Sequence, residues 1–299
     1  MTNKILFSVI VPTYNRAHLI SNTIESILSQ TYTNFELHII DDGSTDATEE
    51  VVQKYLSDKV FYHKKNNGER AVARNFGTRQ SKGDYINWFD SDDIMFPNHL
   101  QQAAEAIEQL NTPEFFSTGF QYQTEAGVVF YRSNYSQNVN HDFHKGNPLS
   151  VDSVFVRKDI ALQNAFNEDI ELSGSEDYEL WMRLAAMYQI HTIPMITTGF
   201  THHNMRSTIV MRDTEKLINR YSKLLYYTTN DPKVKALLGE NLSFFEMKTY
   251  LLLAVDLMNN NQGKLGVKYH VKGFKSSYKI IFERGFYAFI KHFLRHLLS

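Results

Sequence analysis

Short apolar runs alternate with amphipathic stretches over the first 112 residues. The runs are rich in β-branched and aromatic residues, have the length of buried strands, and lie at residues 5–11, 35–40, 60–63 and 85–89. The stretches between them carry apolar residues at helical spacing and predict helices that begin near Ile20, Val51, Glu69 and Pro97. This alternation predicts an α/β fold with a mostly parallel sheet, helices on both faces, and ligands bound beyond the carboxyl ends of the strands.

After Thr112 the pattern changes. It predicts, in order, a hairpin (114–122 and 128–132), a polar loop (133–149), a strand (151–156), a helix (177–187) and another strand (193–200). From Asp213 to the end the pattern is helical. We therefore expect one α/β domain over residues 1–212, followed by a helical C-terminal region over residues 213–299.

The amino-acid composition excludes several kinds of site. The 299 residues include no Cys, which excludes a disulfide framework, a zinc–thiolate site and a cysteine nucleophile. No charged segment followed by a long apolar run opens the chain, and no apolar run reaches the roughly 20 residues of a membrane span. We therefore expect a cytoplasmic protein without a secretory signal.

Charge is spread unevenly along the chain. The net charge is −2, but residues 264–299 hold eight Lys or Arg and one acid, so the first 263 residues hold 23 Lys or Arg and 32 Asp or Glu. An acidic body argues against a nucleic-acid-binding protein. Apolar residues from Phe286 to Leu297, interleaved with Lys291 and Arg295, predict a basic amphipathic helix. Two interpretations of it stay open, namely peripheral contact with an anionic membrane and packing on protein.

A run of carboxylates follows the predicted strand 85–89. Asp90-Ser91-Asp92-Asp93 places three carboxylates within four residues. Their mutual repulsion is costly unless a cation or several hydrogen-bond donors compensate it. Mn²⁺ and Mg²⁺ prefer oxygen ligands and would do so. The alternative is a solvated turn in which an Asp caps the next helix.

Other strand and helix ends carry polar groups too. Asp42 follows the strand 35–40, so a second strand end bears carboxylates, although Asp-Gly alone is also typical of a turn. Arg70 and Arg74 lie in the first turns of a predicted helix, which is a natural anion site or an ordinary polar face. Asp177 begins another helix, either as a helix-capping acid or as a general base.

Five motifs together resemble those of the family 2 glycosyltransferases over about residues 5–210. They are Ser8-Val9-Ile10-Val11-Pro12-Thr13-Tyr14-Asn15-Arg16, Ile39-Ile40-Asp41-Asp42-Gly43-Ser44-Thr45-Asp46, Ala73-Arg74-Asn75, Phe89-Asp90-Ser91-Asp92-Asp93 and Glu176-Asp177-Tyr178-Glu179-Leu180-Trp181. The resemblance implies the GT-A fold, with a nucleotide-sugar binding half (1–112) and an acceptor half (113–212). It also implies an inverting, metal-dependent transfer that uses Mn²⁺ or Mg²⁺.

The resemblance further implies a set of donor-binding residues. This set is Pro12, Thr13, Tyr14, Arg16, Asp42, Arg70, Arg74, Asp90, Ser91 and Asp92. Tyr14 would stack on the nucleotide base, Asp42 would accept a hydrogen bond from it, and Arg70 or Arg74 would lie near base and phosphates. Asp90 would face the ribose or the donor sugar.

Metal and catalytic roles follow from the same resemblance. Asp92 or Asp93 would hold the metal, and His203 is the third expected ligand. His203 stands where many members have a histidine near the diphosphate, although their preceding Tyr-Arg is Phe200-Thr201 here. Asp177 would take the proton from an acceptor hydroxyl.

The expected function is transfer of a sugar from a nucleotide donor, foremost a UDP-sugar, to a glycan or lipid-linked acceptor in surface polysaccharide or glycoconjugate synthesis. One alternative is a nucleotidyltransferase, which has a similar sheet but also a Gly-rich phosphate loop that the first strand here lacks. The other is a non-catalytic nucleotide-sugar-binding module, which would lack Asp177 or the Asp-Ser-Asp run.

Overall fold

The computed structural model describes residues 4–124, 126–136, 138–202 and 213–298, except the side chains of His202 and of residues 295–298. The chain forms two compact units. The sheet unit consists of Met1–Val139, Leu149–Ile170 and Tyr188–His203, and the helical unit consists of Asn140–Pro148, Glu171–Met187 and Asn204–Ser299. The functional boundaries expected after residues 112 and 212 stay predictions.

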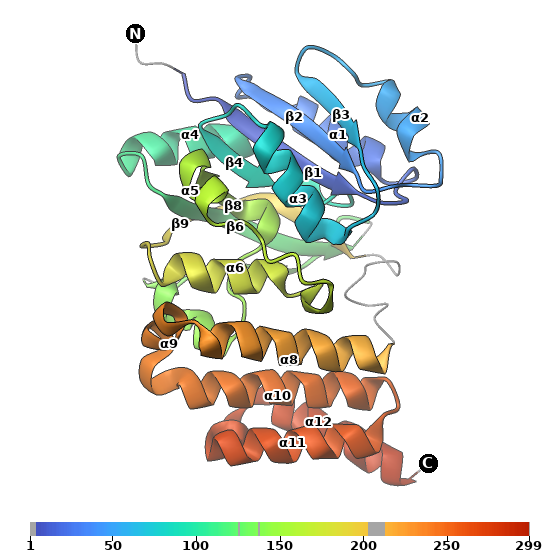
Figure 1. Cartoon of the computed structure of the whole chain (residues 1–299), viewed down its shortest axis with the longest axis vertical. Coiled ribbons are helices and arrows are strands. Elements are labelled where there is room, and N and C mark those ends of the chain that lie inside the picture. The colour runs from blue at the N-terminus through green and yellow to red at the C-terminus, as the bar shows by residue number, and fades with distance from the viewer. Residues whose placement is uncertain (1–3, 125, 137, 203–212, 299) are drawn as a thin grey trace. The chain divides into compact units, whose positions relative to one another are not determined.

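A nine-stranded sheet organises the sheet unit (Figure 1). Its strands are β1 (Phe7–Thr13), β2 (Phe35–Asp41), β3 (Val60–Lys64), β4 (Tyr85–Trp88), β5 (Ile94–Met95), β6 (Phe115–Thr124), β7 (Val129–Arg132), β8 (Val154–Arg157) and β9 (His191–His202). They lie in the order β3-β2-β1-β4-β8-β6-β9-β5, and β7 pairs with β6. The first four are mutually parallel, as predicted, but β8 runs antiparallel to both β4 and β6, so the whole sheet is mixed.

Helices cover both faces of this sheet. They are α1 (Ile20–Leu28), α2 (Thr48–Gln53), α3 (Glu69–Gln80), α4 (His99–Gln109) and α5 (Lys158–Gln163). Alternate residues of β1, such as Val9 and Val11, share one core with the apolar faces of α1 and α4. Ile10 points to the opposite face, where Gly77 lets α3 approach so closely that a Cβ there would lie 2.4 Å from the Ile10 side chain.

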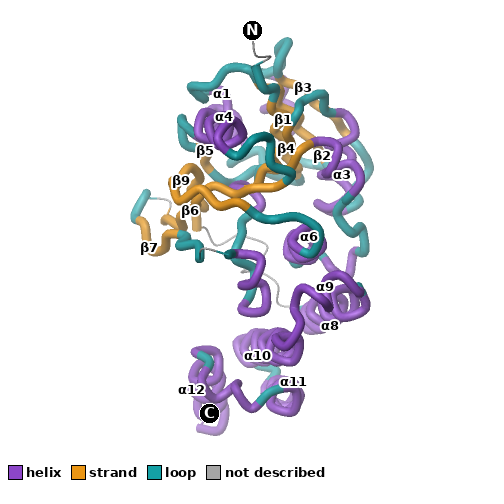
Figure 2. The backbone as a smooth tube through the Cα atoms, turned by 90° about the vertical axis from the view of Figure 1, so that its left-hand side faces the viewer, coloured by secondary structure: helices purple, strands orange, loops and turns teal. Residues whose placement is uncertain are grey.

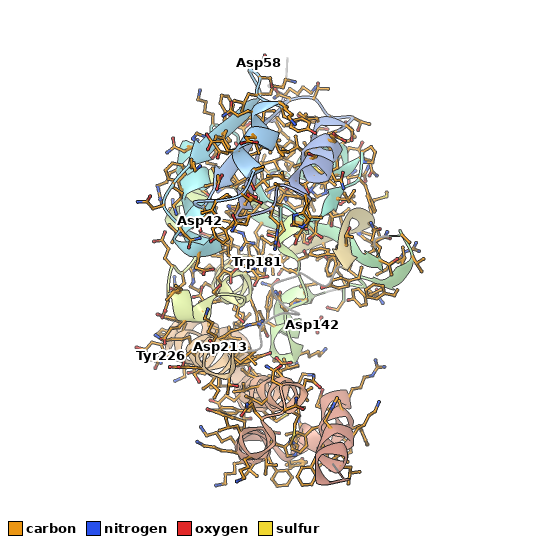
Figure 3. All side chains as sticks on the ribbon, turned by 90° about the vertical axis from the view of Figure 1, so that its right-hand side faces the viewer. Asp42, Asp58, Asp142, Trp181, Asp213 and Tyr226 are labelled. Carbon is orange, nitrogen blue, oxygen red and sulfur yellow. The ribbon has the colours of Figure 1, made fainter. Side chains whose placement is uncertain are left out.

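The helical unit holds α6 (Glu176–Ala185), α8 (Thr214–Asn230), α9 (Pro232–Leu238), α10 (Leu242–Asn259), α11 (Gly263–Ser276) and α12 (Arg284–Leu298). Asp213, labelled in Figure 3, caps α8 by accepting hydrogen bonds from the backbone N–H groups of Glu215 and Lys216. α8, α10, α11 and α12 share one apolar core, and Figure 2 shows α11 and α12 both beside α10. Among the described residues, no helix has the length and apolar character needed to cross a membrane.

Three local predictions need correction. The stretch 133–149 was expected to be a loop, yet Val139–Lys145 forms a 3₁₀ helix. The predicted strand 151–156 begins instead as a 3₁₀ turn, Val151–Ser153, before β8. β5 was not predicted, because two residues are too few to show a periodic pattern.

Glu36 ties β2 to its neighbours at the end of the sheet opposite the carboxyl ends of the strands. Its carboxylate accepts hydrogen bonds from Ser8 Oγ (2.7 Å) and from the Lys82 backbone N–H (2.5 Å), and it lies 3.1 Å from His38 Nε2. Burial opposes ionisation of Glu36, but the hydrogen bonds from His38, Lys82 and Ser8 outweigh it and lower its pKa to about 2. The ionised carboxylate therefore stabilises the folded state.

We expect Glu36→Gln to lower the free energy of unfolding at pH 7 by up to about 3 kcal/mol. A lowered pKa gives stability above the unfolded value near 4.5, and this stability is lost as pH falls toward 2. Urea unfolding of the wild type and the variant should show a difference that shrinks by more than half between pH 7 and pH 3. Glu50→Gln, an exposed change on α2, is the control. An equal difference at both pH values would contradict the prediction.

Candidate active site

The carboxyl ends of β1, β2 and β4 meet at one edge of the sheet because the three strands are parallel neighbours. The first residues of β8 join them, because β8 runs antiparallel to β4 and Asn87 pairs with Phe155. This pairing brings Asp152, three residues before Phe155, to the run Asp90–Asp93 that follows β4. The edge thus gathers carboxylates from two segments that lie far apart in the sequence.

Asp90, Asp93 and Asp152 form a carboxylate cluster in which one oxygen of each lies within 4.8 Å of the others. Asp152 is fully buried, and its Oδ1 accepts a hydrogen bond from the Asp90 backbone N–H (2.8 Å). Asn87 Nδ2 donates to the backbone carbonyl of Asp152 (2.9 Å) and so fixes that residue. Burial, followed by the negative charges of Asp93 and Asp90, raises the pKa of Asp152 well above its ordinary value.

The cluster meets the chemical requirements of a divalent cation. Asp152 Oδ2 is buried and has no hydrogen-bond partner among the described residues. Crowded carboxylates of this kind are costly without a positive charge, and hard cations take oxygen ligands. Asp152 was not predicted as a site residue from the sequence, where it is a lone acid in the predicted strand 151–156.

Each carboxylate of the Asp90–Asp93 run also contacts a group from another part of the sheet unit. Arg74, which is buried, donates from Nη2 to Asp90 Oδ1 (2.7 Å). Asp93 Oδ1 accepts a hydrogen bond from the Thr201 backbone N–H (3.0 Å), which joins β9 to the run. Asp92 is partly exposed, and its Oδ2 lies 3.8 Å from Arg16 Nη2. Two predicted cations, Arg16 and Arg74, therefore lie beside two predicted carboxylates.

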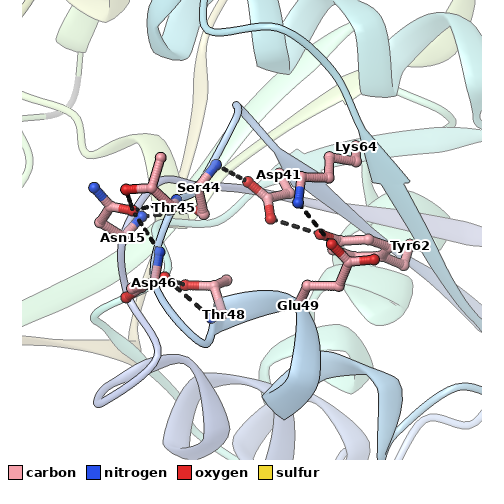
Figure 4. A network of polar contacts seen from close by, with 9 residues as sticks. All are labelled: Asn15, Asp41, Ser44, Thr45, Asp46, Thr48, Glu49, Tyr62 and Lys64. Atoms are coloured by element: carbon pink, nitrogen blue, oxygen red, sulfur yellow. Dashed lines mark hydrogen bonds and ion pairs between the residues drawn. The ribbon is translucent and has the colours of Figure 1, made fainter.

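The loop after β1 is held by the loop after β2 (Figure 4). Asn15 adopts a left-handed conformation (φ 52°), its N–H donates to Ser44 Oγ, and its Oδ1 accepts from the Thr45 N–H. This contact leaves the Tyr14 side chain 47% exposed while the preceding Pro12 and Thr13 stay buried. The predicted stacking residue thus presents its ring to solvent at the edge where the carboxylates lie.

Asp41 and Asp42 both serve the local structure. Asp41 is buried and accepts hydrogen bonds from the Ser44 N–H (2.7 Å) and the Tyr62 hydroxyl (2.6 Å), as Figure 4 shows. Burial, followed by this hydrogen bond, raises the pKa of Tyr62. Asp42 accepts from Lys65 Nζ (2.5 Å) and from the Gly68 N–H (3.0 Å). Its predicted contact with a base stays a prediction.

The start of α3 faces the same edge. Glu69, the first residue of the helix, has a φ of 71°, which is unusual for a residue with a side chain. Arg70 follows and is half-buried, whereas Arg74 lies one turn further in, with its guanidinium 5.2 Å from the centre of the Phe166 ring. Arg70 is therefore the more accessible of the two arginines predicted near the nucleotide. Ser91 is buried within the carboxylate run.

Asp177 lies in the helical unit, in the first turn of α6. Its carboxylate is half-buried and accepts a hydrogen bond from Asn147 Nδ2 (3.1 Å). The turn before it is fixed by Arg220 Nε, which donates to Ser175 Oγ (2.7 Å). One turn further along α6, Trp181, labelled in Figure 3, is fully buried. Asp177 thus has an orienting partner and a rigid support, as a general base requires. His203 lies outside the described residues.

Comparison with known proteins places this geometry in context. The sequence profile described as Glycosyl transferase family 2 matches residues 8–157. An uncharacterized glycosyltransferase of Rickettsia felis is 31% identical over 275 residues, which cover 85% of this chain and 44% of that protein. One of Rickettsia typhi is 30% identical and covers 63% of this chain and 62% of that protein. The chain thus spans less than two thirds of these relatives.

Solved structures show the same fold. TarS 1–349 of S. aureus in complex with UDP-GlcNAc has a TM-score of 0.65 at 18% identity, with 90% of this chain and 89% of that chain covered. The mannosyltransferase PcManGT of Pyrobaculum calidifontis, in complex with GDP-Man and Mn²⁺, has a TM-score of 0.60 at 18% identity, with 99% and 87% covered. These likenesses confirm the predicted GT-A fold. With the family profile covering half of its residues, the chain belongs to the family 2 glycosyltransferases.

Proposed function

We propose that this chain transfers a sugar, with inversion, from a nucleotide-diphosphate donor to a hydroxyl of a glycan or lipid-linked acceptor. The observation that carries the proposal is the set of carboxylates after β4, beside Arg16 and Arg74, at the sheet edge where α/β proteins bind ligands. TarS, which shares the fold, is solved with UDP-GlcNAc. A UDP-sugar is therefore the proposed donor, and the expected halves, 1–112 for the donor and 113–212 for the acceptor, are part of the proposal.

On this proposal, the donor lies along the edge formed by β1, β2 and β4. The exposed ring of Tyr14 stacks on the base. Arg70, at the start of α3, and Arg16 meet the phosphates, because a helix N-terminus and guanidinium groups both favour anions. Arg74, whose guanidinium bonds Asp90, holds that carboxylate toward the ribose or sugar. Asp42 stabilises the Lys65–Gly68 loop that borders the site.

A divalent cation, Mn²⁺ or Mg²⁺, fits the carboxylates of Asp92 and Asp93. Asp92, like Asp90, is partly exposed, so it can reach both ion and donor, and its neighbour Asp93 belongs to the cluster with Asp90 and Asp152. The ion would offset the negative charge that develops on the leaving nucleoside diphosphate. PcManGT, of the same fold, is solved with Mn²⁺. His203 remains a proposed third ligand.

Asp177 is the proposed general base. Its carboxylate takes the proton from the acceptor hydroxyl as that oxygen attacks the anomeric carbon, and the bond from carbon to the diphosphate oxygen breaks on the opposite side. Asn147 orients the carboxylate through its hydrogen bond to Oδ2. We propose surface polysaccharide or glycoconjugate synthesis at the cytoplasmic side of a membrane as the setting.

A donor-hydrolysis screen tests the proposed function. Purified protein is incubated with nucleotide sugars in Mn²⁺, Mg²⁺ or EDTA, and release of the nucleoside diphosphate is measured. We expect release from one or a few UDP-sugars only when the metal is present. Binding of every donor without release would favour a non-catalytic module. A parallel incubation contains a nucleoside triphosphate and a sugar phosphate in place of the nucleotide sugar. Release of pyrophosphate there would instead identify a nucleotidyltransferase.

A further inference from the structure

Part of the apolar surface of α12 packs on the core of the helical unit, and the rest of it is exposed. Phe286, Phe289 and Phe293 lie on the side of the helix that packs on the core with α10. Tyr287, Ile290 and Leu294 continue the apolar surface around the helix, and all three are exposed, Tyr287 by 64%. Their spacing of three and four residues places them in one stripe along α12. This stripe has no covering element among the described residues.

The short segment between α11 and α12 extends the exposed apolar surface. This segment, η5 (Tyr278–Phe282), is anchored by Ile280, which is fully buried. Its other apolar residues point outward, with Tyr278 67% exposed and Phe282 74% exposed. Phe274, at the end of α11, is also exposed. Large rings that are exposed to water do not stabilise the connection between two helices. Their presence there indicates a binding surface.

Cationic side chains accompany these rings. Exposed Lys or Arg residues of the same segment are Lys264, Lys268, Lys272, Lys275, Lys279, Arg284 and Lys291. The one acid, Glu283, is bonded to Lys248 at 2.6 Å, so its charge is already neutralised. Net charge over residues 264–299 is therefore strongly positive, while the rest of the chain is acidic. We call the exposed apolar residues from Phe274 to Leu294, together with the exposed cations that lie among them in the sequence (Lys275, Lys279, Arg284 and Lys291), the aromatic–basic surface.

We propose that the aromatic–basic surface docks on an anionic phospholipid bilayer. Tyr and Phe rings enter the boundary between headgroups and acyl chains, and Lys and Arg meet lipid phosphates. A second copy of the chain is a poorer occupant, because its own aromatic–basic surface would bring like charges together. This docking goes beyond the proposed transferase activity, since it requires no sugar donor and no metal.

Flotation of the full chain with liposomes tests the docking. We expect binding to vesicles of phosphatidylcholine with 30% phosphatidylglycerol at 0.1 M NaCl, weak binding to phosphatidylcholine alone, and weaker binding at 0.5 M NaCl. Tyr278→Ser combined with Phe282→Ser should reduce partitioning about tenfold or more, because two exposed rings are lost. Lys275→Glu combined with Lys279→Glu should reduce it about thirtyfold or more on the anionic vesicles, because two attractive charges become repulsive.

Tyr226→Ser is the matched control. Tyr226 is an exposed ring on α8 of the same unit, outside the aromatic–basic surface (Figure 3), so its loss should leave flotation unchanged. Circular dichroism and the melting temperature confirm that each variant is folded. The proposal is overturned if the wild type does not float with anionic vesicles, or if the Tyr278/Phe282 variant floats as well as the control. A concentration-dependent dimer that this variant abolishes would assign the surface to self-association instead.

Discussion

Replacing Asp177 by Asn is expected to lower the rate of sugar transfer about 10³-fold while the Kd for the nucleotide stays unchanged. The amide keeps the size of the side chain and a hydrogen-bonding oxygen for Asn147, but it does not accept the proton of the acceptor hydroxyl. The loss should therefore appear in kcat with acceptor present. Initial rates of transfer and calorimetric titration with UDP measure the two quantities.

Glu240→Gln is the control for Asp177→Asn. Glu240 is an exposed acid of the same helical unit, so the same chemical change there should leave kcat as it is. Melting temperatures within a degree or two of the wild type would exclude a folding defect in either variant. Transfer by Asp177→Asn at the wild-type rate would show that another group is the base. The proposal for the donor-binding residues would not be affected by that result.

Asp92→Asn is expected to lower transfer about 10²-fold or more and to abolish the rise in melting temperature that Mn²⁺ gives the wild type. The change removes one negative charge from the partly exposed Asp92 and leaves one amide oxygen where the proposed metal ligand has two carboxylate oxygens. Removing the metal from the wild type with EDTA should have the same effect on the rate. Thermal unfolding with and without Mn²⁺, together with initial rates, measures both effects.

Asp152→Asn separates metal binding from folding. Burial raises the pKa of Asp152, so stability from this group is lost as pH rises through its folded-state pKa, and an amide avoids that loss. In EDTA at pH 7.5 we therefore expect Asp152→Asn to melt at the wild-type temperature or above it.

The Asp92→Asn prediction has its own contradicting outcome. If that variant lost activity but still gained the full stabilisation from Mn²⁺, Asp92 would not be a metal ligand.

The first half of the fold could be predicted because each element carries its own local signal. The buried strands β1, β2 and β4 appear as β-branched and aromatic runs, and α3 begins at the predicted residue, Glu69. β8 was found as a strand, but its direction was not, because strand direction depends on long-range pairing with β4 and β6. The mixed character of the sheet therefore had to come from the structure.

The same long-range pairing explains which site residue was missed. Asp90, Asp92 and Asp93 stand together in the sequence and follow a recognisable strand. Asp152 is alone in the sequence and joins them only through the antiparallel pairing of β8 with β4. A lone acid within a predicted buried strand is the one signal that could have indicated it, since burial of an acid demands a compensating partner.

Asp42 illustrates the opposite difficulty. Its position at a strand end predicts a ligand contact, yet its carboxylate already accepts hydrogen bonds from Lys65 and Gly68. Sequence patterns identify the edge on which a side chain lies, but they do not identify its partners. Asn15 likewise needed the structure, because its left-handed backbone and its hydrogen bonds to the loop after β2 are what leave Tyr14 exposed.

Anomalous diffraction from crystals grown with Mn²⁺ and UDP tests the central claim most directly. The claim is that the carboxylates after β4 hold a divalent cation together with a nucleoside diphosphate. We predict one strong manganese peak at coordination distance from the Asp92 or Asp93 carboxylate, with the UDP base against Tyr14. Manganese and UDP bound elsewhere on the chain, or an empty edge at saturating concentrations of both, would contradict it.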